Sequence, residues 1–600
     1  MDEALWLERI DAAIKRGDLL YAVESARRAI EEGAKSKRIK YLYVLATARS
    51  GATSWATRLY LEYGLDHETD VDSRTLWARL AKDKAFRSPD RQQDLLFEAA
   101  ELYGRIYQDT EDTFPGINAA TLLAMAGDRQ GSKLLAKEII KVPHIANPEN
   151  YWDAATLIEG LLVVGNTELA FKFVEIAKSY AKNDYGSLSS TFRNLKALLS
   201  VLDPAGLVLE KLKRAFELPN TMIFTGHMFG QIQGSYYRGE AEIIKAIETK
   251  IDERNIKVGY GALACGADIL FAEALLRKNC ELHVILPLDE ESLVQQSVEP
   301  GGDHWVERFY AIKEACKSDT NSFVHATQDE YVGDPRQFTF GMIYAEGMAL
   351  LRSRFIGSDA IMLALWDGES ANGAQTGTAM HVENWRRDGS ELVVIPFQRG
   401  APLSRFSGEV KKKQNVRTLQ AMLFMDFPGF TKLSEGTLPT FWDEVMGGIH
   451  NVLKRHKSKI LAQNTWGDAV HVVLESPADA AELTLAIQAR LAKVDFRSLG
   501  LKYPASMRMS LHYGPVYRVK DKITNRTNFF GSQVSEAARI EPVTPAGAVY
   551  VTEAFAAALE RQDFSHKFEC IFVGEVELAK EFGKRRMYSL IREVQINTKQ

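Results

Sequence analysis

Cysteine is scarce in this sequence, and so are long apolar runs and any large excess of charge of one sign. The 600 residues include only four cysteines, which lie far apart and form no Cys-x-x-Cys pair. This usage argues against a disulfide framework and a cysteine-based zinc site, and it favours a reducing compartment. A formal net charge of −5 argues against a general surface for nucleic acid or anionic membranes.

The beginning of the sequence lacks the features of a secretory signal. "MDEALWLERIDAAIKRGD" carries acidic residues where a signal peptide has positive charge followed by an apolar run. No uninterrupted apolar stretch reaches the ~20 residues needed to cross a bilayer. We therefore expect a cytoplasmic protein without membrane spans. The chain is too long for one hydrophobic core, and we expect about three domains.

Residues 1–215 have the pattern of an all-α helical repeat. Apolar residues recur at three- and four-residue spacing, and turns such as "RGD", "AGD" and "VGN" separate the helices. Helix pairs of this kind bury their apolar faces by stacking on one another. The segment resembles tetratricopeptide arrays, and "FPGINAATLLAMAGDRQGSKLLAKEI" resembles the TRAF-binding helical domain of some kinase kinase kinases. It is either a plain scaffold or a groove for a peptide or protein partner.

Residues 220–398 change to strands that alternate with helices. The predicted strands are short and apolar, as in a parallel sheet covered on both faces; they span residues 221–226, 256–262, 281–287, 360–366 and 391–396. Glycines cluster where these strands end, which is where ligands bind in open parallel sheets. The sequence therefore predicts a Rossmann-like α/β domain with a ligand site at that edge.

Two motifs in this segment, "GALACGADILFAEALL" and "NGAQTGTAMHV", resemble the Rossmann-like SLOG superfamily, which includes the DprA and Lonely-guy proteins. The resemblance implies a nucleotide-derived ligand. The residues that it assigns to the ligand are Gly226, Gly261, Gly266, Asp268, Gly373, Gly377 and Thr378. We favour sensing over catalysis, because the acidic residue of the cleaving members is not evident after the second motif. A purely structural α/β domain, with Asp268 only capping a helix and His227 only a loop residue, is the alternative.

Residues 399–417, rich in proline, glycine, serine and lysine, are predicted to be a linker. Residues 418–600 then predict an α+β domain with helices on one face of an antiparallel sheet. "AMLFMDFPGFTKLSE" predicts a strand, an acidic residue, a Pro-Gly turn and a helix that begins near Thr431. "KILAQNTWGDAVHVVLE" predicts a hairpin with Asp468 beside Gly467. A helix, a strand, a helix around Val534 to Ile540 and a final strand pair follow.

This order of motifs resembles the ferredoxin-like catalytic domain of class III nucleotidyl cyclases over essentially the whole segment. The resemblance implies that Asp426 and Asp468 bind two Mg²⁺ or Mn²⁺ ions, for which carboxylates are suitable hard ligands. The phosphates of the substrate would lie on the turn made by Phe427, Gly429, Phe430 and Thr431.

Three further residues stand at positions where the family has side chains that act on the phosphates or the ribose. Arg539 takes the place of the transition-state arginine, and Lys580 that of a phosphate-contacting lysine. Ser535 stands where the family usually has an asparagine that orients the ribose. A serine hydroxyl is shorter and makes fewer hydrogen bonds, so rate or substrate geometry is expected to differ.

The two positions that contact the base in this family are Asn464 and Asn528 here. An amide offers donors and an acceptor, so the pair fits adenine, cytosine or uracil. The glutamate that goes with guanine is absent, which weakens the case for GTP. Trp466 should lie on the same side of the strand as Asn464. It is either a shelf in the base pocket or, as we favour, a core or subunit-interface residue.

We therefore expect a ligand-regulated cyclase that converts a nucleoside triphosphate to a 3′,5′-cyclic nucleotide, with ATP favoured and UTP or CTP as alternatives. The resemblance implies a head-to-tail homodimer, in which each chain gives part of each site. A second hypothesis is a binding and assembly protein whose weakened cyclase domain serves as a dimeriser. A third is that the SLOG-like domain itself cleaves a nucleotide-derived molecule.

Overall fold

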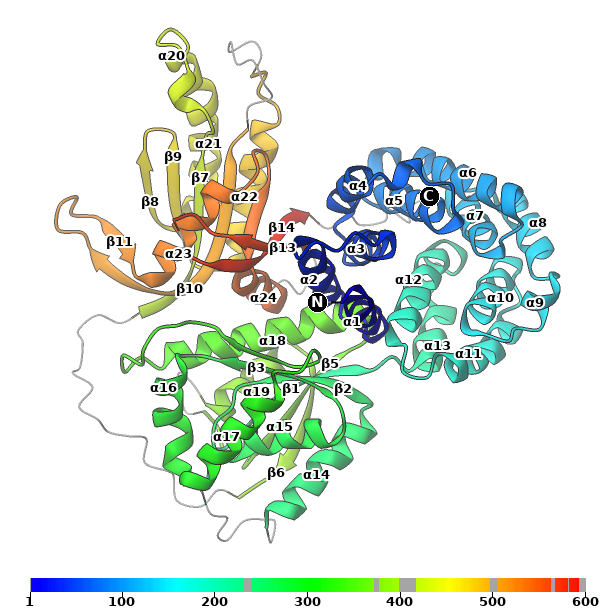
Figure 1. The fold of residues 1–600 in the computed structure, drawn as a ribbon. Helices are drawn as coiled ribbons and strands as arrows, with labels where there is room; N and C mark the ends of the chain where they lie inside the picture. Colours follow the sequence, from blue (N-terminus) through cyan, green and yellow to red (C-terminus); the bar gives the residue numbers. More distant parts are fainter. Residues whose placement is uncertain are drawn as a thin grey trace. The chain divides into compact units, whose positions relative to one another are not determined.

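The computed structural model describes residues 2–230, 239–371, 377–398, 417–496, 506–562, 567–580 and 582–592. The chain forms two compact units (Figure 1). The first runs to Pro219 and includes Phe355–Ser358, and the second contains Asn220–Arg354 and the described residues from Asp359 onward. The second unit holds two separate β-sheets.

The first unit is helical, and its turns explain why one helix follows another. Gly17, Gly127 and Gly165 each end a helix in the left-handed conformation, at φ 71°, 100° and 93°. Glycine adopts that conformation without steric cost. The Asp or Asn that follows each glycine caps the next helix: Asp18, for example, accepts a hydrogen bond from the Tyr21 N–H. The Gly-Asp and Gly-Asn pairs are therefore both stop and start signals.

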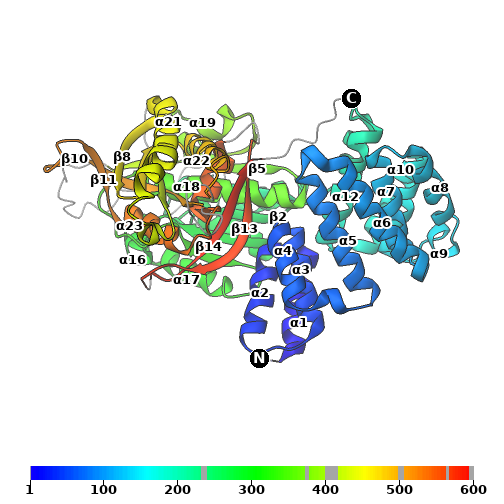
Figure 2. The same cartoon turned by 90° about the horizontal axis from the view of Figure 1, so that it is seen from above.

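Consecutive helices of this unit pack against each other (Figure 1 and Figure 2), so the predicted all-α N-terminal region is confirmed. The helices are α1 Glu3–Arg16, α2 Leu19–Glu31, α3 Lys37–Arg49, α4 Thr53–Glu62, α5 Val71–Phe86, α6 Gln92–Thr110, α7 Thr113–Ala126, α8 Arg129–Ile139, α9 Pro143–Ala146, α10 Tyr151–Val164, α11 Thr167–Ala181, α12 Tyr185–Leu202 and α13 Leu207–Phe216.

The first sheet of the second unit is parallel throughout, in the order β4-β3-β2-β1-β5-β6. Its strands are β1 Asn220–Gly226, β2 Ile256–Gly261, β3 Glu281–Leu286, β4 Ser322–His325, β5 Ala360–Trp366 and β6 Glu391–Pro396. Its helices are α14 Glu240–Glu253, α15 Ala267–Arg277, α16 Glu290–Leu293, α17 Asp303–Ala315, α18 Arg336–Ile356 and α19 Thr378–Arg387. The Rossmann-like prediction is confirmed, and the sequence missed only the short strand β4.

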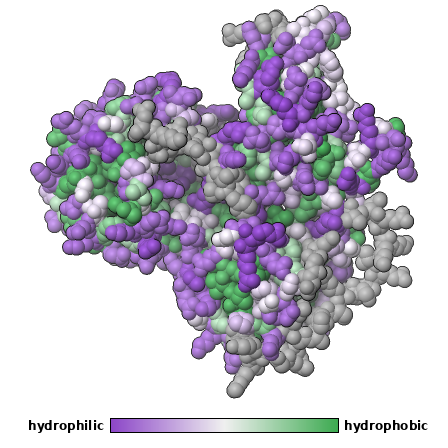
Figure 3. Space-filling view, turned by 180° about the vertical axis from the view of Figure 1, so that it is seen from behind, coloured by the Kyte–Doolittle hydropathy of each residue, from purple (hydrophilic) through white to green (hydrophobic). Residues whose placement is uncertain are grey.

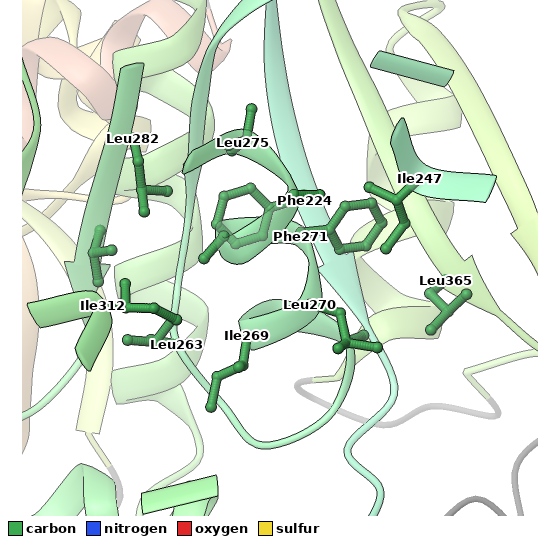
Figure 4. Close-up of a cluster of buried hydrophobic side chains, with 14 of the residues drawn as sticks. Phe224, Ile247, Leu263, Ile269, Leu270, Phe271, Leu275, Leu282, Ile312 and Leu365 are labelled. Carbon is green, nitrogen blue, oxygen red and sulfur yellow. The ribbon is translucent and has the colours of Figure 1, made fainter. Parts of the chain in front are cut away.

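The core of this domain lies between the sheet and α15. Phe224 of β1 and Phe271 of α15 stack with ring centroids 5.7 Å apart (Figure 4). Leu263, Ile269 and Leu275 are fully buried around them. Because the strand order reverses between β1 and β5, the ends of these two strands form the switch point at which open α/β sheets bind ligands.

The second sheet has the order β13-β14-β12-β10-β7-β9-β8, and β11 pairs with β10. Its strands are β7 Arg417–Asp426, β8 Ile460–Trp466, β9 Ala469–Leu474, β10 Arg508–Lys520, β11 Thr527–Phe530, β12 Val549–Thr552, β13 Phe568–Glu577 and β14 Lys584–Arg592. Its α-helices are α20 Leu438–Phe441, α21 Gly447–Arg455, α22 Pro477–Leu491, α23 Ser532–Ile540 and α24 Glu553–Gln562. The predicted hairpin is β8 and β9.

Three expectations from the sequence are wrong in this domain. The sheet is mixed, because β10 and β12 are parallel. No α-helix begins near Thr431: a 3-10 turn, Phe430–Lys432, follows the Pro-Gly turn, and the helical segment starts at Leu438. Arg417, assigned to the linker, is already the first residue of β7; residues 399–416 lie outside the described part.

None of the helices in the described residues combines the length and the apolar character that a bilayer span requires. On the face shown in Figure 3, hydrophilic residues surround separate hydrophobic patches.

Candidate active site

Asp426 and Asp468 are brought together at the end of the second sheet. Asp426 is the last residue of β7, which pairs with β9 through Met425 and Val470. One residue beyond that pair, Asp426 faces Ala469, the neighbour of Asp468. The two carboxylates that the sequence assigned to metal therefore come from the end of β7 and from the turn that leads into its neighbour β9.

Asp468 lies in the tight turn of the β8–β9 hairpin. Gly467 before it has φ 63°, a left-handed conformation that glycine allows. The Asp468 Oδ2 accepts a hydrogen bond of 3.2 Å from the backbone N–H of Phe427. Burial, and then the nearby negative charge of Asp426, raise the pKa of Asp468. The pair is thus electrostatically strained and would be stabilised by a cation.

Arg508 and Glu541 adjoin this pair and were missed by the sequence analysis. Arg508 lies opposite Asp426 in the β7–β10 register, and its Nη2 is 2.7 Å from Asp426 Oδ2. Its Nε is 2.7 Å from Glu541 Oε1. Burial raises the pKa of Glu541 to about 7, and the carboxylates of Asp426 and Asp468 contribute to the rise. No sequence pattern pointed to Arg508, because only the β7–β10 register gives its partner.

Asp426 and Asp468 fit a divalent-cation site. Both offer hard carboxylate oxygens, and their mutual repulsion would be relieved by a bound cation. Among the described residues, no group of three or more acidic, histidine or cysteine side chains is arranged to hold a metal. Mg²⁺ is usually bound by one or two protein carboxylates, and substrate phosphates and water complete its coordination shell.

The turn after β7 is held by its own contacts. Phe427 is buried, and its ring packs against Phe441 with centroids 4.8 Å apart. The Phe430 N–H bonds to the Phe427 carbonyl at 3.1 Å, and Gly429 has φ 88°. Because the N–H groups of Phe427 and Phe430 are thus engaged, Gly429 and Thr431 are the backbone donors that this turn could offer to a phosphate.

Asn464 and Asn528 lie side by side although 64 residues separate them in the chain. The Asn464 Nδ2 is 3.5 Å from Asn528 Oδ1, which also accepts the Phe529 N–H at 2.8 Å. The Asn528 Nδ2 donates to Asp521 Oδ2 at 3.3 Å. These contacts orient the amide of Asn528, and they leave acceptor and donor capacity on both side chains.

Trp466 is 63% exposed at the end of β8. Within the described chain it is therefore not a core residue, and that part of the sequence interpretation is wrong. A shelf for the base and packing against a second subunit are the two interpretations that its exposure allows.

Ser535 and Arg539 lie one helical turn apart on α23. The Ser535 Oγ is exposed and 3.4 Å from the carbonyl of Gly531. The Arg539 carbonyl accepts a hydrogen bond of 3.3 Å from the Ala579 N–H, which brings the β13–β14 loop to the end of α23. Lys580, with φ 60°, is the next residue of that loop. The structure therefore places Arg539 and Lys580 in neighbouring segments.

Three of the glycines assigned to a ligand in the parallel-sheet domain lie in two different environments. Gly226 and Gly266 lie at the switch point: a Cβ on Gly226 would meet the Ala267 Cβ at 2.2 Å, and one on Gly266 would meet the Phe229 N at 2.7 Å. Gly261 lies instead against Phe224, where a Cβ would come within 2.3 Å of the ring. The glycine at position 261 is thus explained by core packing.

Asp268 and Thr378 lie in the first turns of α15 and α19. The buried Asp268 accepts the Ala264 N–H at 3.2 Å, and burial raises its pKa to about 7. Gly377 precedes α19 with φ 107°, and Gly373 lies outside the described residues. The side chain of Asp268 therefore binds the loop before α15 and does not cap that helix, which differs from the helix cap of the structural alternative.

His227 and Asp367 are a pair at the switch point that the sequence did not predict. His227 follows β1, Asp367 follows β5, and the His227 Nε2 is 3.0 Å from Asp367 Oδ1. Both side chains are about one-tenth exposed. The structural alternative, in which His227 is only a loop residue, did not include this pair, because Asp367 lies 140 positions away in the chain.

Comparison with known families gives two matches. Residues 18–123 match the family described as Tetratricopeptide Repeats-Sensor. Residues 410–592 match the family described as the Adenylate and Guanylate cyclase catalytic domain.

A curated relative, an adenylate cyclase of Podospora anserina, is 26% identical over 185 residues; the match covers 27% of this chain and 8% of that protein. The adenylyl cyclase CyaB of P. aeruginosa is 17% identical, with 30% of this chain and 96% of that chain covered and a TM-score of 0.26. The guanylyl cyclase Cya2 is 19% identical, with 29% and 93% covered and a TM-score of 0.25.

Proposed function

We propose that this chain, which ends in a class III adenylate and guanylate cyclase catalytic domain and begins with a tetratricopeptide-repeat sensor region, makes a 3′,5′-cyclic nucleotide and pyrophosphate from a nucleoside triphosphate. The observation that carries the proposal is the approach of Asp426 and Asp468 beside the Phe427–Thr431 turn. ATP is the favoured substrate, and UTP or CTP are the alternatives.

The chemistry assigns a task to each part of the site. The ribose 3′-hydroxyl attacks the α-phosphorus, and pyrophosphate leaves. When bound, Mg²⁺ or Mn²⁺ ions supply Lewis-acid stabilisation of the attacking and leaving oxygens. Asp426 and Asp468 would hold these ions, and the N–H groups of Gly429 and Thr431 would bind phosphate oxygens. Arg539 and Lys580 would neutralise the charge that develops on the phosphoryl group, and Ser535 would orient the ribose.

Asn464 and Asn528 would contact the base. The Asn464 Nδ2 faces the Asn528 Oδ1. This contact leaves the Asn464 Oδ1 as an acceptor and an N–H of the Asn528 amide as a donor for the ligand. That pattern suits the acceptor–donor edge of adenine or cytosine, and it suits uracil in the reverse order.

A homodimer is part of the proposal, because in this family the cleft lies between two cyclase domains. The exposure of Trp466 and of Phe530 (48%), on the two strands that carry Asn464 and Asn528, supports a covering partner. A second subunit is the occupant that we propose for this face.

Regulation by the parallel-sheet domain is supported by contacts within the second unit. Arg417, 3% exposed at the start of β7, has its Nε 2.9 Å from Asp334 Oδ2. The Ser532 Oγ at the start of α23 donates to Asp329 Oδ2 at 3.0 Å. Asp329 and Asp334 follow β4, so the sheet domain contacts both the strand that ends in Asp426 and the helix that carries Arg539. A nucleotide-derived ligand near Gly226, Gly266 and the His227–Asp367 pair would act through these contacts.

An assembly role with a weakened cyclase domain is the second candidate. It is favoured by Ser535, whose hydroxyl is directed to the Gly531 carbonyl of its own helix. A protein partner of the helical region would fit either candidate.

The test is incubation of the full chain with Mn²⁺ and each of the four common nucleoside triphosphates, with products identified by mass. A cyclic product from one of them supports the cyclase. No cyclic product from any, together with intact cellular function of an Asp426→Ala variant, would favour the assembly role. Release of a free base would point to the SLOG-like domain as the enzyme.

A further inference from the structure

Four basic side chains from three helices meet inside the helical unit. They are Arg49 at the end of α3, Arg79 and Lys82 on α5, and Arg193 on α12. Lys82 is only 6% exposed, and Arg79 keeps 19% of its side-chain surface. Arg79 repels each of the other three, and Arg193 also repels Arg49 and Lys82, so the four groups form one electrostatic cluster. We call these four residues the basic cluster.

Negative charge in the basic cluster does not match the positive charge. Among the described residues, the only carboxylate within 4.0 Å of any of the four is Asp83, whose Oδ2 is 3.5 Å from the Arg79 Nε. Lys82 instead donates to the neutral amide of Asn194 at 3.3 Å, and Arg193 donates to the Arg49 carbonyl at 3.3 Å. Lys82 and Arg193 therefore donate to neutral acceptors, and neither they nor Arg49 has a carboxylate within 4.0 Å.

Beyond 4.0 Å, Asp184 attracts Arg49 and Glu159 attracts Lys82, but Glu159 does not balance the cluster. It is buried and accepts a hydrogen bond from the hydroxyl of Thr121, and burial raises its pKa. Burial and the neighbouring cations lower the pKa of Lys82 to about 8 and those of Arg49 and Arg193 to about 10. Buried charges in proteins are normally paired, because an unpaired charge loses its hydration without gaining a partner.

Hydrogen-bonding capacity is also unused. The Nε of Arg49 is buried and makes no hydrogen bond, and the buried Nε of Arg79 has only the 3.5 Å ion pair with Asp83. Arg49 and Arg193 remain partly accessible to water, although protein surrounds them. Guanidinium groups offer paired N–H donors that match the oxygens of a phosphate, and lysine adds a point charge.

We propose that the basic cluster is a binding site for a small phosphate-bearing anion inside the helical unit. An anion would balance the excess of cations and would accept hydrogen bonds from them, and Arg49 and Arg193 are the partly accessible members of the cluster. The position of Lys82, almost fully enclosed, fits a small molecule rather than the surface of a folded partner. The site is separate from the cyclase residues and does not depend on the proposed cyclase activity.

The test uses the full chain in EDTA, which removes divalent ions from the cyclase domain. Pyrophosphate, ATP, UTP, a 3′,5′-cyclic nucleotide and a polyglutamate peptide are titrated separately by calorimetry, and the thermal midpoint is recorded with each. The inorganic and nucleotide arms distinguish the possible sources of the phosphate. The variants are Lys82→Met and Arg193→Gln, and Lys84→Gln is the matched control, since Lys84 is an exposed cation on the same helix.

At least one phosphate compound is expected to bind and to raise the midpoint of the wild type. Lys82→Met is expected to raise the midpoint of the unliganded chain, because it removes a buried charge, and to weaken the anion at least about tenfold. Arg193→Gln should weaken the anion similarly, whereas Lys84→Gln should not. Binding at pH 8 to 9 should take up a proton, since an anion restores the charge of Lys82.

Three results would overturn the proposal: no binding of any phosphate compound, binding of the peptide alone, or equal weakening by Lys84→Gln and Lys82→Met. Each of them can be obtained whether or not the chain makes a cyclic nucleotide.

Discussion

The guanidinium of Arg508 is ion-paired with Asp426, with Nη2 2.7 Å from Oδ2, and the same side chain reaches Glu541 at 2.7 Å. Asp426 ends β7, and Glu541 directly follows α23, the helix of Arg539. Arg508 therefore ties the strand of a proposed metal ligand to the helix of the proposed transition-state arginine.

Replacement of Arg508 by Gln is expected to lower kcat about tenfold or more and to raise the Mn²⁺ concentration needed for half-maximal rate. The reason is that Asp426 and Glu541 would lose the side chain that holds them in position, so Asp426 would no longer be oriented for the metal. Steady-state rates across a Mn²⁺ titration measure both effects. Arg518→Gln, an exposed arginine on the same strand, is the control. Equal kinetics in the two variants would rule out this role.

Replacement of Asp468 by Asn is expected to lower turnover at least about 100-fold. The same replacement is expected to raise the stability of the metal-free folded chain. The pKa of Asp468 is raised in the folded chain, so its ionised form costs stability above that pKa, and the cost disappears as the pH falls. The gain in melting temperature should therefore be present at pH 7 and shrink in acid. Asp443→Asn, an exposed site, should change neither property. Residual activity above a few per cent would count against the metal role.

Exchange of Asn464 for lysine is expected to shift the ratio of kcat/KM toward ATP by about tenfold, since the resemblance to class III cyclases implies that lysine at this position goes with adenine. Competition between ATP, UTP and CTP in one reaction gives the ratio directly. Gln463→Lys adds the same charge on the opposite face of β8 and serves as the control. An unchanged ranking of the substrates would refute the assignment of Asn464 to the base.

Replacement of Asp329 by Asn is expected to lower kcat about three- to tenfold while leaving the melting temperature nearly unchanged. The variant weakens the contacts with Ser532 at 3.0 Å and with Arg417 at 3.4 Å. Hydrogen exchange of the α23 amides should increase at the same time. Glu330→Gln, at an exposed neighbour, is the control. If α23 exchanges as in the wild type, the contact does not position that helix.

Local patterns in the sequence predicted much of the fold. The β8–β9 hairpin, with Asn464 within β8 and Asp468 in the turn, follows from strand alternation around Gly467. The Gly-Asp and Gly-Asn turns of the helical unit were also visible, because cap residues act within a few positions. The helix expected near Thr431 is absent, because the Gly429 turn closes on itself.

Non-local pairings could not be predicted in this way. The parallel pairing of β10 with β12 joins segments about 40 residues apart, and no local pattern encodes it. The partners of Arg508, of His227 and of Lys82 are likewise distant in the chain. The local sequence around each of these residues gives no sign of its partner, which only the fold brings close.

The central claim is that Asp426 and Asp468 together hold the divalent ions of the reaction. The most direct measurement is a crystal of the full chain with Mn²⁺ and an unreactive triphosphate analogue, recorded at the manganese absorption edge. We predict two anomalous peaks, each within about 2.0–2.3 Å of oxygens from both carboxylates or from one of them and the phosphates. Manganese bound elsewhere, with both carboxylates turned away from it, would contradict the account.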